Sequence, residues 1–177
     1  VQEAYDKVVV PTVEAMAAEG VPFTGILYAG LILTEDGPKT IEFNARFVDP
    51  ETQVVLPRMA SDFGVFMMAL MDSEPFDLKW DDEAMLGVVV AAENYPEDVV
   101  KGAALPDLDV LSAQGLDVFH AGTKSGNTGF VGNGGRVILV TAKADSLKQA
   151  QEEVYKGLSE LKWDGFFYRK GIGWRTF

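Results

Sequence analysis

The sequence contains no cysteine, and its 177 residues include a single histidine. Without thiols, the chain can form no disulfide bond and has no thiolate nucleophile. One imidazole is also too few for a histidine-rich transition-metal site. Any metal ion that this chain binds must therefore be held by oxygen atoms.

Basic residues are scarce as well, because 15 lysines and arginines stand against 27 aspartates and glutamates, for a formal net charge of −12. Nucleic-acid backbones are bound by concentrated positive charge, so we expect no nucleic-acid partner. No apolar run is long enough to cross a bilayer, and no signal segment opens the chain. We therefore expect no membrane partner and a cytoplasmic location.

The first half of the chain predicts a helix followed by two strands. Apolar residues recur every three to four positions from Val1 to about Ala18, where Pro11 kinks the helix or opens a second stretch and Gly20 ends it. Because Val1 already lies inside this pattern, we expect the chain to be a piece of a longer protein. The run 26–33 is apolar on both faces, which indicates a buried strand, and turn formers at 34–39 indicate an antiparallel hairpin with the strand that follows.

That following stretch, 41–53, carries the densest set of polar groups between apolar neighbours. On a strand, Glu42, Asn44 and Arg46 would point to one face. A carboxylate, an amide oxygen and a guanidinium suit a divalent cation beside a phosphate. From the residues alone, a solvated strand face is an equally good interpretation.

The remaining sequence indicates further short helices and several short strands. A helix is expected from Glu51 to about Pro57, and a second from a cap at Ser61 to about Met71. A loop-like acidic stretch at 72–82 suggests a domain boundary. Beyond it we expect strands at 85–92, 117–121, near 130–131 and at 136–141, then a helix at 146–161 whose start, Ser146 with Gln149, is typical of a capping box.

Several motifs resemble those of the phosphoribosylamine–glycine ligases, also called glycinamide ribonucleotide synthetases, which are ATP-grasp enzymes. The likeness extends over nearly the whole chain and is carried by Thr24-Gly25, Tyr28-Ala29-Gly30-Leu31, Asp36-Gly37-Pro38-Lys39, Glu42-Phe43-Asn44-Ala45-Arg46-Phe47, Asp49-Pro50-Glu51-Thr52-Gln53, Phe119-His120-Ala121-Gly122-Thr123, Asn133-Gly134-Gly135-Arg136-Val137 and Asp164-Gly165-Phe166-Phe167-Tyr168-Arg169.

The resemblance implies an α+β fold with two parts. Residues 1–80 would be the C-terminal part of an ATP-grasp core, made of antiparallel strands with helices. Residues 81–177 would be a small β-rich, barrel-sandwich-like domain with one main helix. The intact enzyme would use ATP to join glycine to 5-phosphoribosylamine through a glycyl phosphate in purine biosynthesis, and this chain would need the missing N-terminal part for activity.

The resemblance also implies roles for individual residues. Glu42 and Asn44 would hold Mg²⁺ or Mn²⁺ against the phosphates of ATP, and Arg46 would be catalytic. Asp49, Pro50, Glu51 and Arg136 would contact substrates or phosphate.

One position departs from the family, which usually has glycine where this chain has Val48. Glycine allows a positive φ that valine resists. This departure and the missing lobes leave an alternative open: a non-catalytic module that binds a partner chain or a phosphorylated metabolite.

Overall fold

A computed structural model describes residues 1–176, which form two compact units. The first unit is Val1–Glu51 with Ala60–Lys79, and the second is Thr52–Met59 with the chain from Trp80 onward. Both units contain helices and strands, and every strand pairing in the described residues is antiparallel. The α+β prediction is therefore confirmed.

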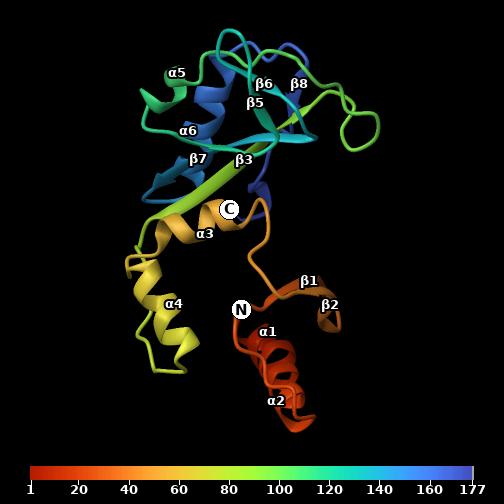
Figure 1. The fold of residues 1–177 in the computed structure, drawn as a ribbon, viewed down its shortest axis with the longest axis vertical. Helices are drawn as coiled ribbons and strands as arrows, with labels where there is room; N and C mark the ends of the chain where they lie inside the picture. The colour runs from red at the N-terminus through yellow and green to blue at the C-terminus, as the bar shows by residue number, and fades with distance from the viewer. Residues whose placement is uncertain (177) are drawn as a thin grey trace. The chain divides into compact units, whose positions relative to one another are not determined.

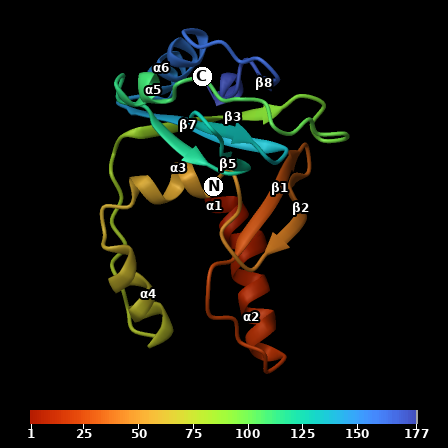
Figure 2. The ribbon, with the colours of Figure 1, turned by 45° about the horizontal axis from the view of Figure 1, so that its top comes forward.

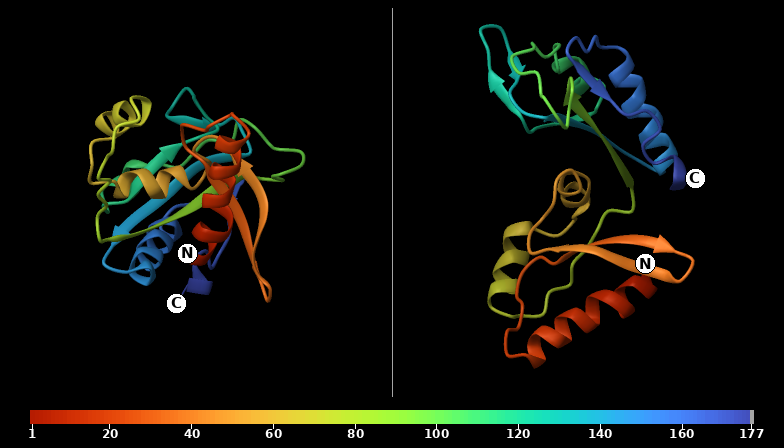
Figure 3. Two further views of the ribbon diagram at one scale, coloured as in Figure 1. Left: turned by 90° about the horizontal axis from the view of Figure 1, so that it is seen from below. Right: turned by 90° about the vertical axis from the view of Figure 1, so that its right-hand side faces the viewer.

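The first unit consists of an N-terminal helical rod (residues 2–18), a hairpin (residues 28–44) and one further helix (Phe63–Met71). In the right-hand view of Figure 3 the rod (red) runs along one side of the hairpin (orange). Pro11 is the second residue of α2 and lacks the N–H of an α-helical bond, and a wider π-helical turn stands just before it. The elements are α1 Gln2–Ala4, η1 Tyr5–Val9, α2 Val10–Ala18, β1 Tyr28–Thr34, β2 Gly37–Asn44 and α4 Phe63–Met71.

The hairpin is confirmed, but the prediction that its first strand is buried is wrong. β1 pairs with β2 from Tyr28 opposite Asn44 to Thr34 opposite Gly37. In the described part of the chain this sheet has only these two strands, and the second half of β1 is not covered by another layer. Ile32 is 53% and Leu33 is 81% exposed. Residues 1–51 and 60–79 contain no fully buried side chain.

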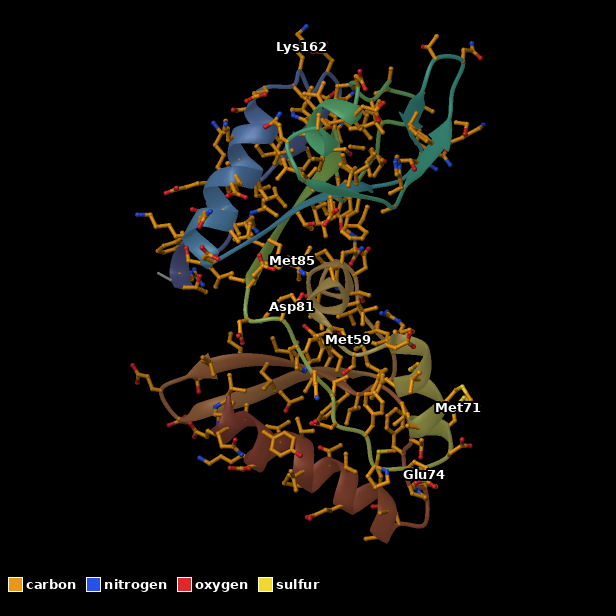
Figure 4. The ribbon with its side chains drawn as sticks, turned by 90° about the vertical axis from the view of Figure 1, so that its left-hand side faces the viewer. Met59, Met71, Glu74, Asp81, Met85 and Lys162 are labelled. Carbon is orange, nitrogen blue, oxygen red and sulfur yellow. The ribbon has the colours of Figure 1, made fainter. Side chains whose placement is uncertain are left out.

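The helix α4 begins at a different cap from the one expected. Asp62, not Ser61, is the N-cap, and its Oδ1 accepts a hydrogen bond of 2.8 Å from the Val65 N–H. The Ser61 hydroxyl instead accepts from the Lys79 N–H at 2.8 Å. The local sequence offered two capping side chains, and a contact 18 residues away decided between them. Figure 4 shows the Met71 side chain on the outer side of this helix, where it is 77% exposed.

The second unit is built on a four-stranded sheet with the order β4-β7-β3-β8. Figure 1 labels its two long strands, β3 and β7. Figure 2 shows α6 on one face of the sheet and α3 on the other. A separate hairpin pairs β5 with β6. The elements are α3 Thr52–Val55, η2 Leu56–Arg58, β3 Ala84–Ala92, α5 Asp109–Ser112, β4 Asp117–His120, β5 Thr123–Ser125, β6 Phe130–Gly132, β7 Arg136–Ala144, α6 Leu147–Ser159, β8 Phe166–Tyr168 and η3 Trp174–Thr176.

The buried core lies between this sheet and α6. The expected helix stripe is confirmed, because Ala150, Val154 and Leu158 are completely buried against the strands. Ser146 is the N-cap, and its hydroxyl accepts from the Gln149 N–H at 3.2 Å. In the capping box predicted from Ser146 and Gln149, the Ser146 hydroxyl forms its hydrogen bond, whereas the Gln149 side chain donates to Glu153.

Four short elements, α5, β5, β8 and η3, were not expected from the sequence. They have three or four residues each, too few for a hydrophobic period to be visible. Among residues 1–176, no helix combines the length and the apolar character needed to span a membrane.

Candidate metal and phosphate site on the hairpin

The polar side chains of β2 gather near the end of the strand. Asn44 donates a hydrogen bond of 3.0 Å from Nδ2 to Oε1 of Glu42. The two residues are separated by one position, so the pleat directs both side chains to the same face, as predicted. Glu42 is exposed and Asn44 is half-buried.

A β-bulge helps to define this face. Gly30 pairs with Glu42 and Leu31 pairs with Thr40, so Ile41 is an extra residue in β2. Because of the bulge, Thr40 and Phe43 both line a groove beside the helical rod. Glu42 and Asn44 therefore lie on the opposite face of the hairpin.

A glycine makes room for the Glu42 side chain. A Cβ atom at Gly30 would lie 3.1 Å from Cγ of Glu42 and 3.5 Å from the Tyr28 ring. These distances mean that the Glu42 side chain lies across β1, over the glycine and next to the tyrosine. Any side chain at position 30 would push it away.

Tyr28 lies beside this cluster on β1. Its ring and Cγ of Glu42 both lie close to the position that a Cβ on Gly30 would take, and its backbone lies opposite Asn44. Burial and the nearby carboxylates of Glu51 and Glu42 raise the pKa of Tyr28, because all three disfavour the phenolate. The carboxylates of Glu51 and Glu42 thus act on a tyrosine that the sequence motifs did not single out for a role. The sequence did contain a signal for Tyr28, because its hydroxyl is a polar group in an otherwise apolar strand.

Arg46 does not follow the predicted alternation. β2 ends at Asn44, and Ala45 and Arg46 form a bend, so the argument that placed Arg46 on the face of Glu42 does not hold. Its guanidinium is exposed and donates from Nη1 to the Phe47 carbonyl at 2.9 Å.

The loop of Asp49, Pro50 and Glu51 leads directly into α3. Asp49 and Glu51 are exposed and Pro50 is half-buried in a turn. The helix predicted from Glu51 starts at Thr52, so Pro50 lies just outside it. Among residues 1–176, the positive-φ residues other than glycine are Ser73 and Asn94. Val48 is thus accommodated without a left-handed backbone.

Arg136 belongs to the second unit, where it is the first residue of β7. Before it, the backbone of Gly134 approaches Gly122 so closely that a Cβ on Gly122 would lie 2.7 Å from Cα of Gly134. His120, also in this unit, has Nδ1 3.0 Å from the Thr123 hydroxyl and its ring centroid 4.4 Å from that of Phe130. These contacts indicate a structural role for His120.

The donor set on the hairpin fits a hard divalent cation that shares its coordination with a ligand. In the described part of the chain, no group of three or more histidines, aspartates and glutamates is arranged to hold a metal ion alone. Glu42 and Asn44 can together offer a carboxylate and an amide oxygen. Mg²⁺ is commonly held by one or two such groups, with phosphates and water completing its shell.

Two family profiles match the chain. Residues 85–175, about half of it, match "Phosphoribosylglycinamide synthetase, C domain", and residues 1–52 match "Phosphoribosylglycinamide synthetase, ATP-grasp (A) domain". The hairpin that carries Glu42 and Asn44 lies in the second of these ranges, and Arg136 lies in the first.

Curated relatives extend the match to nearly all of this chain. The phosphoribosylamine–glycine ligase of Halalkalibacterium halodurans is 51% identical over 172 residues, which are 97% of this chain and 40% of the relative. That of Lactococcus lactis is 50% identical over 178 residues, 99% of this chain and 42% of the relative. The chain therefore spans about 40% of the length of these relatives.

A solved structure has the same fold. The crystal structure of phosphoribosylamine–glycine ligase from Thermotoga maritima aligns with a TM-score of 0.80 and 25% sequence identity. The alignment covers 96% of this chain and 42% of the Thermotoga chain.

Proposed function

The chain belongs to the phosphoribosylglycinamide synthetase family, and from this premise we propose that the whole protein is an ATP-dependent ligase that joins glycine to 5-phosphoribosylamine. The products would be glycinamide ribonucleotide, ADP and phosphate, and the reaction would serve purine biosynthesis in the cytoplasm. The observation that carries the proposal is the Glu42–Asn44 pair, set on one face of a hairpin that matches the family's ATP-grasp domain.

The chemistry requires activation of a carboxylate. The glycine carboxylate is a poor acyl donor, so its oxygen would first attack the γ-phosphorus of ATP to give glycyl phosphate and ADP. The amine of 5-phosphoribosylamine would then attack the carbonyl carbon, forming the amide bond while phosphate leaves. Such transfers depend mainly on positioning and on neutralising charge, and they need no protein nucleophile.

The proposed roles follow from the chemistry of each side chain. Glu42 and Asn44 would hold Mg²⁺ or Mn²⁺, which supplies positive charge beside the ATP phosphates when bound. The Arg46 guanidinium, which is exposed after the strand, would stabilise the transferring phosphoryl group. Asp49, Pro50 and Glu51 would line the substrate side of the loop. In the second unit, Arg136 would contact a ligand phosphate.

We further propose that residues 1–80 are the C-terminal part of an ATP-grasp domain and that residues 81–177 form a separate C-terminal domain. The rest of the ATP-grasp domain would cover the first unit and complete the nucleotide site. Exposed large apolar side chains on the hairpin and on α4 support this, since apolar side chains left exposed can become buried at an interface. They include Ile32 at 53%, Leu33 at 81%, Ile41 at 68% and Met68 at 66% exposure.

A chimeric enzyme tests the proposal. This chain would replace the matching 40% of the Halalkalibacterium halodurans ligase, and ADP release would be measured with glycine and 5-phosphoribosylamine. We expect substrate-dependent turnover in the chimera and none in the 177-residue chain alone.

Two matched substitutions examine the metal assignment in that chimera. Glu42→Gln removes a carboxylate charge and should reduce turnover at limiting Mg²⁺ by at least about a hundredfold. Glu35→Gln makes the same change at an exposed position in the hairpin turn and should leave turnover unchanged. A well-folded chimera without ligation would favour a non-catalytic module, and near-normal turnover of Glu42→Gln would refute the metal assignment.

A further inference from the structure

The short helix α3 lies on the sheet of the second unit at a glycine. A Cβ atom on Gly87 of β3 would lie 2.9 Å from Cγ1 of Val54, 3.0 Å from Cγ2 of Thr141 and 3.2 Å from Cδ1 of Leu139. Because real Cβ atoms essentially never come within 3.0 Å of another heavy atom, this arrangement requires glycine. Val54 of α3 therefore lies directly over the backbone of β3, on the face opposite α6 (Figure 2).

Two buried side chains of β7 complete this seat for α3. Leu139 is 3% exposed and Thr141 is completely buried. Val140 and Ala142, which alternate with them along the strand, belong to the core under α6. Since successive side chains of a strand point to opposite faces, Leu139 and Thr141 are buried on the face that α3 covers. Together with Gly87 they form a closely packed seat, in which one added methyl group has no space.

The other end of the segment that contains α3 is held by Lys143. Its ammonium lies 3.0 Å from the Pro57 carbonyl and 2.7 Å from Oδ2 of Asp81. Lys143 is two positions beyond Thr141 in β7 and so points to the same face of the sheet. The segment Thr52–Met59 is therefore fixed to the second unit both at its helix and near its end.

The loop 49–51, to which we assign substrate contacts, is joined directly to α3. The helix begins at Thr52, the residue after Glu51, so Val54 is three residues from the end of the loop. Ordinary van der Waals contacts begin at 3.4 Å, and a Cβ on Gly87 would therefore push Val54 away by about 0.5 Å. Three residues of chain leave little slack to absorb this shift. Misplacing a substrate contact by about 1 Å can reduce a rate about a hundredfold.

We propose that Gly87 is a positioning residue of the ligase. Because it has no side chain, it lets α3 lie on the sheet and so holds the end of the loop 49–51 where that loop meets a substrate. Gly87 acts through Val54 and leaves the metal pair on the hairpin unaffected. This inference rests on the proposed ligase function.

The variant Gly87→Ala in the chimeric ligase tests this. KM for glycine or for 5-phosphoribosylamine should rise about tenfold, whereas KM for ATP should stay within about twofold of the parent value. A loss of folded enzyme would lower the measured turnover but would change none of these KM values. Val54→Ala removes the methyl group that the new Cβ would meet, so Gly87→Ala/Val54→Ala should have a lower KM than Gly87→Ala.

Gly157→Ala is the matched control for crowding in the second unit. Its new Cβ would meet Cδ1 of Leu116 in the core on the α6 side of the sheet. Both glycine variants should lose stability in urea, but Gly157→Ala should leave every KM unchanged. Equal changes of KM in the two variants would overturn the inference, as would unchanged KM values in Gly87→Ala or the absence of recovery with Val54→Ala.

A second variant decides the matter if Gly87→Ala does not fold. Val54→Leu crowds the same seat from the helix side and leaves β3 as it is. It should raise the same KM as Gly87→Ala, because a larger side chain over Gly87 also lifts α3. Unchanged KM values in a folded Val54→Leu enzyme would contradict the inference.

A measurement on the 177-residue chain itself keeps the inference independent of ligase activity. The backbone amide resonances of Asp49 and Glu51 would be followed by nuclear magnetic resonance. They should shift in Gly87→Ala and Val54→Leu and stay in place in Gly157→Ala, and unshifted signals in the first two variants would overturn the inference. If the chimera shows no ligation but these resonances shift, the proposed function fails while the positioning of the loop stands.

Discussion

The Lys143 ammonium lies 2.7 Å from Oδ2 of Asp81 and 3.0 Å from the Pro57 carbonyl, so one side chain of β7 ties together two segments far from it in sequence. The two segments also contact each other. Arg58 donates from Nη2 to the Asp81 carbonyl at 3.1 Å, and the Asp81 N–H donates to the Arg58 carbonyl at 2.8 Å. Figure 4 marks Asp81 among the labelled residues of this region.

Lys143→Met should destabilise the second unit by about 1–3 kcal/mol, because it removes a partly buried ion pair and leaves a carbonyl without its donor. Urea unfolding followed by tryptophan fluorescence would measure this, since Trp80, Trp163 and Trp174 all belong to that unit. Lys162→Met is the control, because the ion pair of Lys162 with Asp164 is 85% and 75% exposed and should contribute less than about 1 kcal/mol. Equal losses in both variants would contradict the assignment.

Gly122→Ala should destabilise the second unit by about 2 kcal/mol or more, because the new Cβ would meet backbone atoms that cannot rotate away. Its nearest neighbours would be the Arg136 carbonyl and Cα of Gly134, both at 2.7 Å. Gly126→Ala is a milder version of the same change, since the closest atom there is a methyl group of Val131 at 2.9 Å. The same fluorescence assay should rank Gly122→Ala well below Gly126→Ala in stability, and the reverse order would be inconsistent with the close backbone approach.

Gly30→Ala should weaken the metal site without removing either of its proposed ligands. The added methyl group would press on Cγ of Glu42, which lies 3.1 Å from the Cβ position. Because a displaced ligand costs affinity, we expect Mn²⁺ to bind the chimeric ligase about tenfold more weakly. Gly64→Ala, whose Cβ would lie 3.2 Å from a carboxylate oxygen of Asp62, is the control. Unchanged Mn²⁺ affinity in Gly30→Ala would mean that Glu42 does not bind the ion from its present position.

The Tyr28 hydroxyl should ionise at a higher pH than an ordinary tyrosine, because burial and the carboxylates of Glu51 and Glu42 raise its pKa above 10.0. The absorbance of tyrosinate during an alkaline titration measures this, and Tyr28→Phe should remove a late component. If the lost amplitude instead lies in the ordinary range, the environment described for Tyr28 is wrong.

The raised pKa of Tyr28 also has a consequence for stability. The folded chain holds the phenolic proton more tightly than the unfolded chain does. The contribution of Tyr28 to the free energy of unfolding is therefore complete below the ordinary pKa and is lost as the pH rises through the higher folded value. Alkaline unfolding curves of the parent and Tyr28→Phe should differ in this range of pH, with the parent losing more stability.

Local sequence patterns were sufficient to predict the structure where residues close in sequence are also in contact in the fold. Helix α6 illustrates this, because its buried stripe and its Ser146 cap depend on residues three and four positions apart. The Glu42–Asn44 pair could likewise be predicted, since two residues one position apart on a strand share a face. The prediction failed for Arg46 because the strand ends before it, and strand ends are poorly marked in sequence.

By itself, the sequence determined the hairpin, the main helix, the oxygen-only chemistry of a possible metal site and the motifs of the family. The tertiary structure alone decided that the Glu42 side chain lies over Gly30, that Asp62 replaces Ser61 as a cap, that Lys143 joins Pro57 to Asp81, and that β1 lies uncovered over half its length. The physical reason is that these features depend on which distant atoms come into contact. Side-chain hydrogen bonds and burial are set by such contacts, whereas periodicity and capping preferences are properties of a short stretch of chain.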